Sequence, residues 1–418
     1  MKSWILLASL LSNLILYGCE NMNTSMLAPF FPLCASKKGL SMAWIGGIYG
    51  IADATLLMTS ILVPIIANEK NTKLLYVSAI MISSLSLIAF GIFVKIENLN
   101  MFILFCLLIR AISGISVGII YSCAVVIITN IHSKKAGFII SCMQGMQGLG
   151  NASGPFIGGI LFKIGGFTMP FVVVGSMELI LSLVSAVTTP HLSTKENVPE
   201  NATEESYKTL NIKQILRILF LSFPYFNLLV YSSFRDTALA IFLKDIFDMN
   251  EDRNYIVFSV YGIFSTVTTP MAGFLIERGY GIMIFVISQF IMSLVYLGFK
   301  LLELPHFRNM YTLYIIIILN SLGNPSLIST SFLVLESELE SLHKKSINFI
   351  RLRIAMWMCF LRSSGKLIGS MVIAGLLVEH INFSQCCIGI FMFNLLASVI
   401  CTYFLSNVIC RKVYYRKN

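Results

Sequence analysis

Residues 191–212, HLSTKENVPENATEESYKTLNI, form the most polar segment of an otherwise apolar chain. The 418-residue sequence is 56% hydrophobic and only 12% charged, a composition that excludes an ordinary soluble domain. A helix needs about 20 apolar residues to cross the roughly 30 Å hydrocarbon core of a bilayer. Six stretches of that length precede the polar segment and six follow it. The sequence therefore predicts an all-α membrane protein with two six-helix bundles, residues 1–190 and 213–418, joined by a cytoplasmic linker.

The twelve predicted spans are the apolar runs themselves. They cover residues 4–30, 42–67, 74–94, 101–127, 137–162, 170–190, 213–240, 255–276, 281–302, 308–334, 353–378 and 383–408. The first run continues past Gly18 without a small-residue cleavage site, so we interpret it as a retained helix rather than a signal peptide. Lys and Arg residues between the spans are concentrated on the side that carries both termini, which predicts that both termini are cytoplasmic. The net charge of +10 reflects this bias and does not indicate nucleic-acid binding.

Several classes of chemistry have no sequence signal. The ten cysteines fall largely within the predicted helices, and no metal-ligand spacing is present. No nucleophile–base constellation or phosphate-binding loop appears, so we expect neither enzymatic activity nor ATP drive within this chain. We expect a monomer in the lipid bilayer that needs no metal or other cofactor and whose partners are protons and a small organic substrate.

Two glycine motifs recur at equivalent places in the two halves. GNASGPFIGG at 150–159 lies in the fifth predicted span, and GKLIGSMVIAG at 365–375 lies in the eleventh. Small residues four apart allow helices to approach closely, and a proline kinks a membrane helix. A single motif of this kind most often serves packing alone, but two copies in matching spans indicate the internal duplication that is typical of secondary transporters.

These motifs resemble those of the major facilitator superfamily. The segment 150–159 resembles the antiporter motif of the fifth helix, and the matching residues are Gly150, Gly154, Pro155, Gly158 and Gly159. Arg110, four residues before Gly114, resembles the fourth-helix motif associated with proton coupling. GFLIERGY at 273–280 resembles the superfamily's loop motif, with Gly273, Glu277 in place of the usual Asp, and Arg278. The corresponding first-half segment, IIANEKNTK, lacks the acid–arginine pair. The resemblance implies the major facilitator fold.

The first span resembles that of the vesicular amine transporters, solute carrier family 18. In GCENMNTSMLAPFFP at 18–32, Glu20-Asn21-Met22 precedes a Pro-x-x-Pro segment in the register of that family. The continuation ASKKGLSMAWIGGIYG at 35–50 resembles the polyamine branch, and RDTALAIFL at 235–243 resembles a seventh-helix segment whose acid, here Asp236, is functional. The resemblance implies exchange of protons for an organic cation, a polyamine or a monoamine.

Acidic residues inside membrane spans are costly and point to function. Glu20 is the leading candidate, because a buried carboxylate can bind either a proton or an ammonium group. The remaining candidates for substrate or proton binding are Asp236, Glu178, Tyr49 and Tyr121. Each has a structural alternative: Glu20 could only accept hydrogen bonds from a neighbouring helix, and Asp236 could lie in solvent at the luminal end of its helix. Glu178 is either the partner of Arg110 or an acid used in packing.

Two further expectations concern charge pairs. Arg235 and Asp236 are adjacent, so we expect them to point to different helix faces, and they need not neutralise each other. The vesicular monoamine transporters pair a Lys in helix 2 with an Asp in helix 11. This sequence has Asp53 in helix 2, and Arg362 and Lys366 in helix 11, so we hypothesise that the pair is kept with its sign reversed. The alternative is that Lys366 extends to the membrane interface and Asp53 faces water.

The sequence thus predicts a proton-coupled secondary transporter that works by alternating access and loads vesicles with an organic cation. A multidrug/H⁺ antiporter of the plasma membrane shares the fifth-helix motif. A transport-inactive, receptor-like member of the same fold is the other alternative, favoured by the degraded first loop motif.

Overall fold

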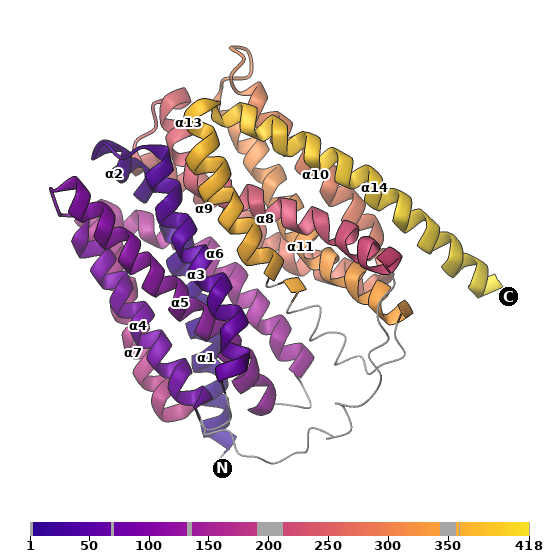
Figure 1. Cartoon of the computed structure of the whole chain (residues 1–418), viewed down its shortest axis with the longest axis horizontal. Coiled ribbons are helices and arrows are strands. Elements are labelled where there is room, and N and C mark those ends of the chain that lie inside the picture. Colours follow the sequence, from indigo (N-terminus) through magenta and orange to yellow (C-terminus); the bar gives the residue numbers. More distant parts are fainter. Residues whose placement is uncertain are drawn as a thin grey trace.

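The computed structural model describes residues 3–67, 71–131, 136–189, 212–342, 357–358 and 360–417. Within these ranges every regular element is a helix. Figure 1 shows the helices as two groups that lie side by side, one from each half of the chain. All of the linker except Ile212 lies outside the described residues.

The N-terminal half consists of six long helices and one short one. They are α1 (Ser3–Met26), α2 (Phe31–Lys37), α3 (Met42–Ile66), α4 (Thr72–Phe93), α5 (Leu99–Ile131), α6 (Ala136–Gly165) and α7 (Thr168–Thr188). The short helix α2 lies in the connection between α1 and α3, at the end of the bundle opposite to the N-terminus (Figure 1).

The C-terminal half repeats this arrangement. Its elements are α8 (Ile212–Phe247), α9 (Glu251–Leu275), η3 (Ile276–Tyr280), α10 (Gly281–Leu301), α11 (Met310–Leu342), η4 (Ile368–Leu377), α13 (Val378–His380) and α14 (Phe383–Lys417). Helical residues from 360 onward lead into the π-helical η4. Each of the twelve predicted spans corresponds to a helix or helical segment, and the predicted all-α fold is confirmed.

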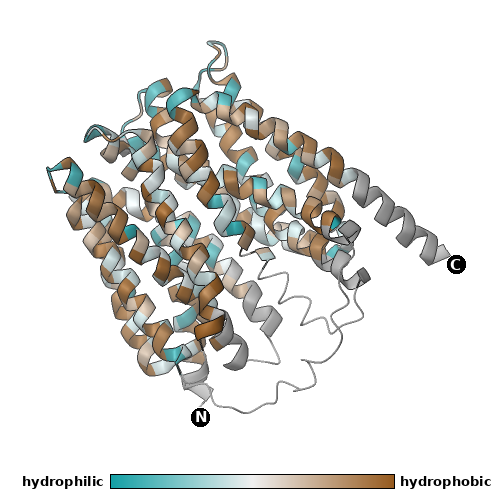
Figure 2. Cartoon of the chain, viewed as in Figure 1, coloured by the Kyte–Doolittle hydropathy of each residue, from teal (hydrophilic) through white to brown (hydrophobic). Residues whose placement is uncertain are grey.

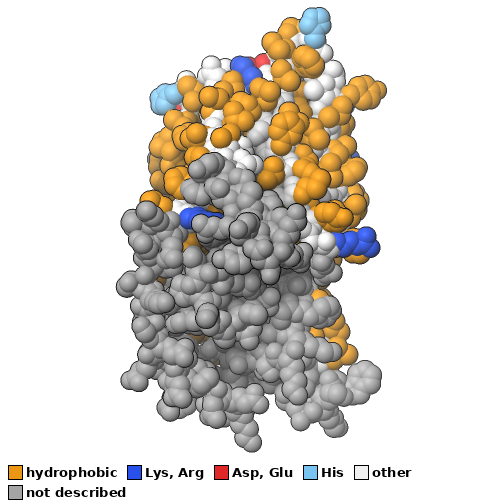
Figure 3. Space-filling model, turned by 90° about the vertical axis from the view of Figure 1, so that its right-hand side faces the viewer, with side chains coloured by type: hydrophobic (Ala, Val, Ile, Leu, Met, Phe, Trp, Pro, Cys, Tyr) orange, Lys and Arg blue, Asp and Glu red, His pale blue; other side chains and the backbone are white. Residues whose placement is uncertain are grey.

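The outer surfaces of the helices are apolar. Nine described segments are long and apolar enough to cross a membrane. Large hydrophobic side chains face outward along them, among them Ile65, Val187 and Tyr311, which are 77%, 85% and 83% exposed. Figure 2 shows the apolar residues along the lengths of the helices, and in Figure 3 hydrophobic side chains cover most of the described part of one face. Such a surface is stable in lipid, where exposed apolar side chains carry no hydration cost.

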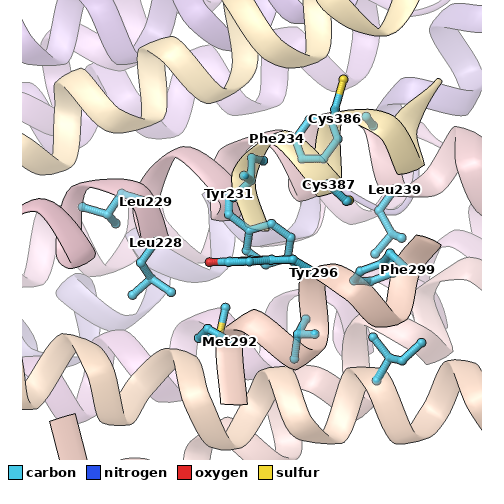
Figure 4. Close-up of a cluster of buried hydrophobic side chains, with 14 of the residues drawn as sticks. Leu228, Leu229, Tyr231, Phe234, Leu239, Met292, Tyr296, Phe299, Cys386 and Cys387 are labelled. Atoms are coloured by element: carbon cyan, nitrogen blue, oxygen red, sulfur yellow. The ribbon is translucent and has the colours of Figure 1, made fainter. Parts of the chain in front are cut away.

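The interior of the C-terminal half is a close-packed aromatic core. The rings of Tyr231 and Tyr296 lie 4.6 Å apart in an edge-on arrangement, and Met292 and Phe299 pack beside them (Figure 4). All four side chains are fully buried. Aromatic contacts of this kind add to the stability gained from burial, and they make this half a firm support for the helices that line the site.

Candidate functional site

A small cavity lies where the two halves meet, and charged side chains from both halves line it. Asp53 of α3 and Arg110 of α5 come from the N-terminal half, and Arg362 and Lys366 come from the segment that leads into η4. The other lining residues are Thr24, Ala52, Leu56, Ser113, Gly114, Val117, Tyr121 and Ser363. The cavity measures about 40 Å³, which is room for a few water molecules. The sequence hypothesis placed Asp53 opposite Arg362 and Lys366, and the structure brings these three residues to one cavity.

Asp53 is surrounded mainly by positive charge. The strongest attraction on its carboxylate comes from Lys366, followed by Arg110 and Arg362, whereas the charge of Asp236 opposes them. Among the described residues, ion pairs join Arg235 to Asp236 and Lys300 to Glu303. No direct salt bridge joins Asp53 to Lys366 in this part of the chain. The two residues share the cavity and act on each other across it.

Arg110 lies between this cavity and a second one. The second cavity measures about 10 Å³, room for a single water molecule, and lies within the N-terminal half. Thr24, Arg110 and Ser113 line both cavities. Asp53 and Glu20 both act on the Arg110 guanidinium, and its Nε has no hydrogen-bond partner among the described residues. Arg110 is therefore the charged group shared by the two cavities.

Glu20 reaches the second cavity from inside the N-terminal bundle. It is 1% exposed, and Ser83 Oγ of α4 donates hydrogen bonds to its Oε2 and Oε1 at 3.0 and 3.3 Å. Glu178 of α7, also 1% exposed, accepts a hydrogen bond from the Asn23 amide at 3.4 Å. The two carboxyl groups contact each other. Glu20 thus has both a hydrogen-bond donor on a neighbouring helix and an acidic neighbour, and it lies behind the central cavity rather than in it.

Arg235 and Asp236 neutralise each other in the structure, although adjacent residues on a helix need not. Arg235 Nη2 and Nε lie 2.7 and 3.0 Å from Asp236 Oδ1, so the adjacent residues form an ion pair. The long arginine side chain folds back along the helix to reach its neighbour, and the Tyr261 ring lies 4.1 Å from its guanidinium. A cation that is only 7% exposed requires a nearby countercharge, and Asp236 supplies it.

The two candidate tyrosines occupy different places. Tyr121 lines the central cavity, donates a hydrogen bond from its hydroxyl to Asn21 Oδ1 at 3.1 Å, and places its ring 5.6 Å from Arg362. Tyr49 is buried 5.8 Å from Arg110, and its hydroxyl has no hydrogen-bond partner among the described residues. Tyr121 is therefore the one of the two that lines this cavity.

The motif glycines lie at close helix contacts. A Cβ on Gly150 would meet the backbone oxygen of Gly18, and one on Gly154 would lie 2.6 Å from the backbone oxygen of Met22. Gly158 faces Met26 in the same way, and Gly159 faces the ring of Tyr255 across the seam between the halves. Pro155 lies inside α6 without interrupting it. These residues hold α6 tightly against α1 and α9.

The loop motif lies at the sharp turn between α9 and α10. The turn depends on Gly279, whose φ of 89° favours glycine. The Arg278 guanidinium lies 4.2 Å from the Phe274 ring, and Gly273 has open space beside it. The Glu277 side chain lies outside the described residues.

The end of the cavity toward α2 and α13 is closed by contact between the halves. A Cβ on Gly46 of α3 would lie 2.6 Å from Gly375 Cα of η4 and would also meet the backbone oxygen of Ser370. One residue pair adds a hydrogen bond: Ala43 N donates to Glu379 Oε1 at 2.9 Å. Backbone contact at this density excludes a passage for solutes between α3 and η4.

Sequence reasoning missed the polar partners of the acids. Ser83, Asn23 and Thr24 were not singled out, although they contact or line the acid site. Serines at 83, 84 and 86 inside an apolar span are a signal that could have identified the α4 side. Their spacing alone did not show which of them faces Glu20.

The fold and the charged inter-bundle cavity are those of a secondary transporter. A sequence model of the Major Facilitator Superfamily matches residues 14–339, and the chain belongs to this superfamily. Among solved structures, a mutant of the nucleoside transporter NupG has a TM-score of 0.69 at 13% identity, covering 94% of this chain and 99% of that one. A bacterial homologue of the lysosomal transporter Spinster has a TM-score of 0.68 at 14% identity, covering 97% of both chains. At these identities the likeness shows the fold.

Two curated relatives extend the comparison. The MFS-type transporter SLC18B1 of Mus musculus is 24% identical over 261 residues, which are 62% of this chain and 55% of the mouse protein. The chain thus matches about half the length of that relative. The multidrug resistance protein MdtG of Proteus mirabilis (strain HI4320) is 24% identical over 283 residues, covering 63% of this chain and 66% of that protein. The predicted resemblance to solute carrier family 18 is confirmed by the first of these.

Proposed function

We propose that this protein exchanges protons for a small organic cation, a polyamine or a monoamine, by alternating access. The observation that carries the proposal is the pair of cavities joined at Arg110. One contains Asp53 at the meeting of the two halves, and the other leads to Glu20. A transporter can couple two ions through two sites that affect each other, and a charged group common to both provides that link.

In this proposal Asp53 binds the substrate's ammonium group. Its carboxylate faces the cavity without a direct salt bridge to Lys366, so an ammonium group can take the position nearest to it. The surrounding Arg110 and Lys366 weaken the attraction that a lone buried carboxylate would exert on a cation. Moderate affinity suits a transport site, because the substrate must also leave. Tyr121 lines the same cavity and offers an aromatic face.

Arg110 couples the two sites. When Glu20 is ionised, its charge attracts the Arg110 guanidinium and leaves Asp53 more negative toward the substrate. When Glu20 holds a proton, Arg110 is attracted mainly to Asp53 and disfavours the bound cation. Protonation therefore releases substrate, and deprotonation favours its binding, which is the sign that exchange requires.

We place the protein in a secretory or synaptic-type vesicle membrane, with both termini in the cytoplasm. The distribution of Lys and Arg between the spans supports this orientation. An acidic lumen would then protonate Glu20 and release the cation inside. In the plasma membrane, with the same orientation, the same exchange would remove cations from the cell, as in a multidrug antiporter, and the similarity to MdtG favours this second candidate.

The test is uptake of spermine, serotonin and acetylcholine into acidified proteoliposomes. We expect proton-driven uptake of at least one of these cations and its loss in Glu20→Gln. Uptake of many unrelated apolar cations would favour the multidrug function. Uptake of an anionic solute alone, for example a dicarboxylate, would contradict the proposal and indicate that Arg110, Arg362 and Lys366 form the binding site. Absence of transport for every class of solute would favour the receptor-like alternative.

A further inference from the structure

Glu20 and Glu178 bring two acids together inside the N-terminal bundle. Glu20 comes from α1 and Glu178 from α7, and both are almost completely buried. Ser83 donates to both oxygens of Glu20, and Asn23 donates to Glu178 Oε2. Three of the four carboxyl oxygens therefore accept a hydrogen bond from a neutral side chain.

The fourth carboxyl oxygen lacks a hydrogen-bond donor in the described part of the chain. Glu178 Oε1 is buried and has no hydrogen-bond donor among the described residues. The neighbouring carboxyl group of Glu20 lies in hydrogen-bonding contact with Glu178. Two carboxylates have no hydrogen to share, so this contact is a hydrogen bond only when one of the two acids is protonated. A proton on the pair supplies a donor for this contact, beside the unpartnered Oε1 of Glu178.

The charges around the pair support a single proton. Arg110 of α5 is the charged group that acts on Glu20, and it also acts on Asp53. The other titratable groups near the pair are Cys19 of α1, Tyr76 of α4 and Tyr121 of α5, which are neutral at neutral pH. On α6 the one basic residue is Lys163, which lies 5.1 Å from the Tyr255 ring. A single arginine balances one carboxylate, and a second buried negative charge requires a proton.

We propose that Glu20 and Glu178 share the transported proton in a site separate from the substrate cavity. The inference rests on the proposed exchange function and identifies its proton site. The second cavity, which leads to Glu20, holds about one water molecule and has no room for an organic ammonium group. Thr24, Ser86 and Ser113 line this cavity together with Arg110, so it connects Glu20 to the arginine that also lines the substrate cavity.

This arrangement replaces competition at one carboxylate with coupling between two sites. In the sequence hypothesis, the proton and the ammonium exclude each other from Glu20 itself. In the structure, the proton stays behind the cavity wall and the substrate stays in front of it. The two are linked through Arg110, which lines both spaces.

The test separates proton coupling from substrate passage. In Glu178→Gln we expect proton-driven uptake to fall to the level of protein-free vesicles, whereas counterflow of labelled substrate against unlabelled substrate continues near the wild-type rate. Uptake that remains proton-driven in Glu178→Gln would overturn the inference. Loss of counterflow together with uptake in a folded variant that still binds substrate would mean that substrate passage itself requires Glu178, and would also overturn the inference.

A measurement without substrate distinguishes failure of this inference from failure of the proposed function. The wild-type protein at neutral pH should show infrared absorption of a protonated, buried carboxyl group. Both Glu20→Gln and Glu178→Gln should lose that absorption, because the new amide donates to the remaining carboxylate and no proton is needed. Absorption unchanged in both variants would contradict the shared proton. If both variants lose the absorption but the wild-type protein transports no cation, the shared proton is supported and the proposed cation exchange is refuted.

Discussion

The first, third and sixth long helices of each half enclose a buried polar cluster, but the two clusters differ in chemistry. In the N-terminal half, α1, α4 and α7 contribute Glu20, Ser83 and Glu178. In the C-terminal half, α8, α10 and α14 contribute amides and hydroxyls. There, Asn394 Nδ2 donates to Ser293 Oγ at 2.8 Å and to the Gln289 backbone oxygen at 3.1 Å, and Asn227 Nδ2 donates to Asn394 Oδ1 at 3.4 Å.

This difference separates what the duplicated fold requires from what the transport chemistry requires. Both halves use polar side chains to join the same three helices, so the polar contact itself belongs to the architecture. Only the N-terminal cluster is built from groups that can gain and lose a proton. The C-terminal cluster is neutral and can join helices without titrating, so the proton exchange that we propose depends on the N-terminal cluster.

The largest expected effect comes from replacing an acid of the N-terminal cluster. Glu20→Gln should abolish proton-driven uptake, because the amide has a similar shape but cannot carry the exchanged proton. The matched change in the other half, Asn394→Leu, should retain uptake and lower stability by about 1–3 kcal/mol, since it leaves buried amides without partners. Proteoliposome uptake and thermal unfolding in detergent measure the two effects. Equal loss of transport in both variants would refute the claim that only the N-terminal cluster takes part in proton exchange.

A second prediction concerns the charges that face each other across the halves. Asp53→Lys and Lys366→Asp should each abolish uptake, because each leaves like charges around the cavity. The double exchange should recover a measurable part of it, since the attraction between the two halves returns. Uptake by the single and double variants provides the double-mutant cycle. A double variant no better than either single variant would show that the two residues do not act as a pair.

Substitution of a glycine at a close helix contact should lower stability by a similar amount in the two halves. Gly154 and Gly369 each bring a helix against the backbone of its half's first helix, at Met22 and Val230. Valine at either position should lower stability by about 1–3 kcal/mol through overpacking. Gly148, which has open space beside it, provides the control: Gly148→Ala should be nearly neutral. Thermal unfolding in detergent measures all three, and a large difference between the first two would mean that the halves pack differently.

The sequence predicts these features unequally. Hydropathy predicted a helical segment at each of the twelve apolar runs, and nine described segments are long and apolar enough to cross a membrane. Membrane cost identified Glu20, and the resemblance to the vesicular monoamine transporters placed Asp53 opposite Lys366. The rotation of α4 and α7 about their axes decided that Ser83 and Glu178 meet Glu20, and a single sequence does not specify that rotation. Side-chain conformation decided the Arg235–Asp236 pair, which residue spacing alone left open.

The smallest expected effect lies at the end of α10, where the C-terminal half has an ion pair. Lys300 Nζ lies 2.5 Å from Glu303 Oε2, and Ser384 donates to Glu303 Oε1. At the corresponding end of the N-terminal half, Lys38 Nζ donates to the Ile96 backbone oxygen at 2.6 Å instead. Burial alone would raise the pKa of Glu303, but the hydrogen bonds from Lys300 and Ser384 and the Lys300 charge lower it below its usual value.

This pKa sets the sign of a pH effect. A lowered pKa in the folded state means that Glu303 stabilises the protein above its unfolded pKa of about 4.3, and that this contribution is lost as the pH falls through the folded pKa. Glu303→Gln should therefore lower stability at neutral pH by a few tenths of a kcal/mol, because the pair is well exposed to solvent. Melting curves from neutral to acidic pH should show the difference vanishing at low pH. A difference that grows on acidification would contradict this assignment.

The most direct test of the shared-proton site is the number of protons released when the purified protein binds its cation. Calorimetric titration in buffers of different ionisation enthalpy gives this number without a membrane gradient. The account predicts release of about one proton by the wild-type protein, and none by Glu20→Gln or Glu178→Gln, although both variants still bind the cation. Proton release that is unchanged in both variants would contradict the claim that these two acids hold the exchanged proton.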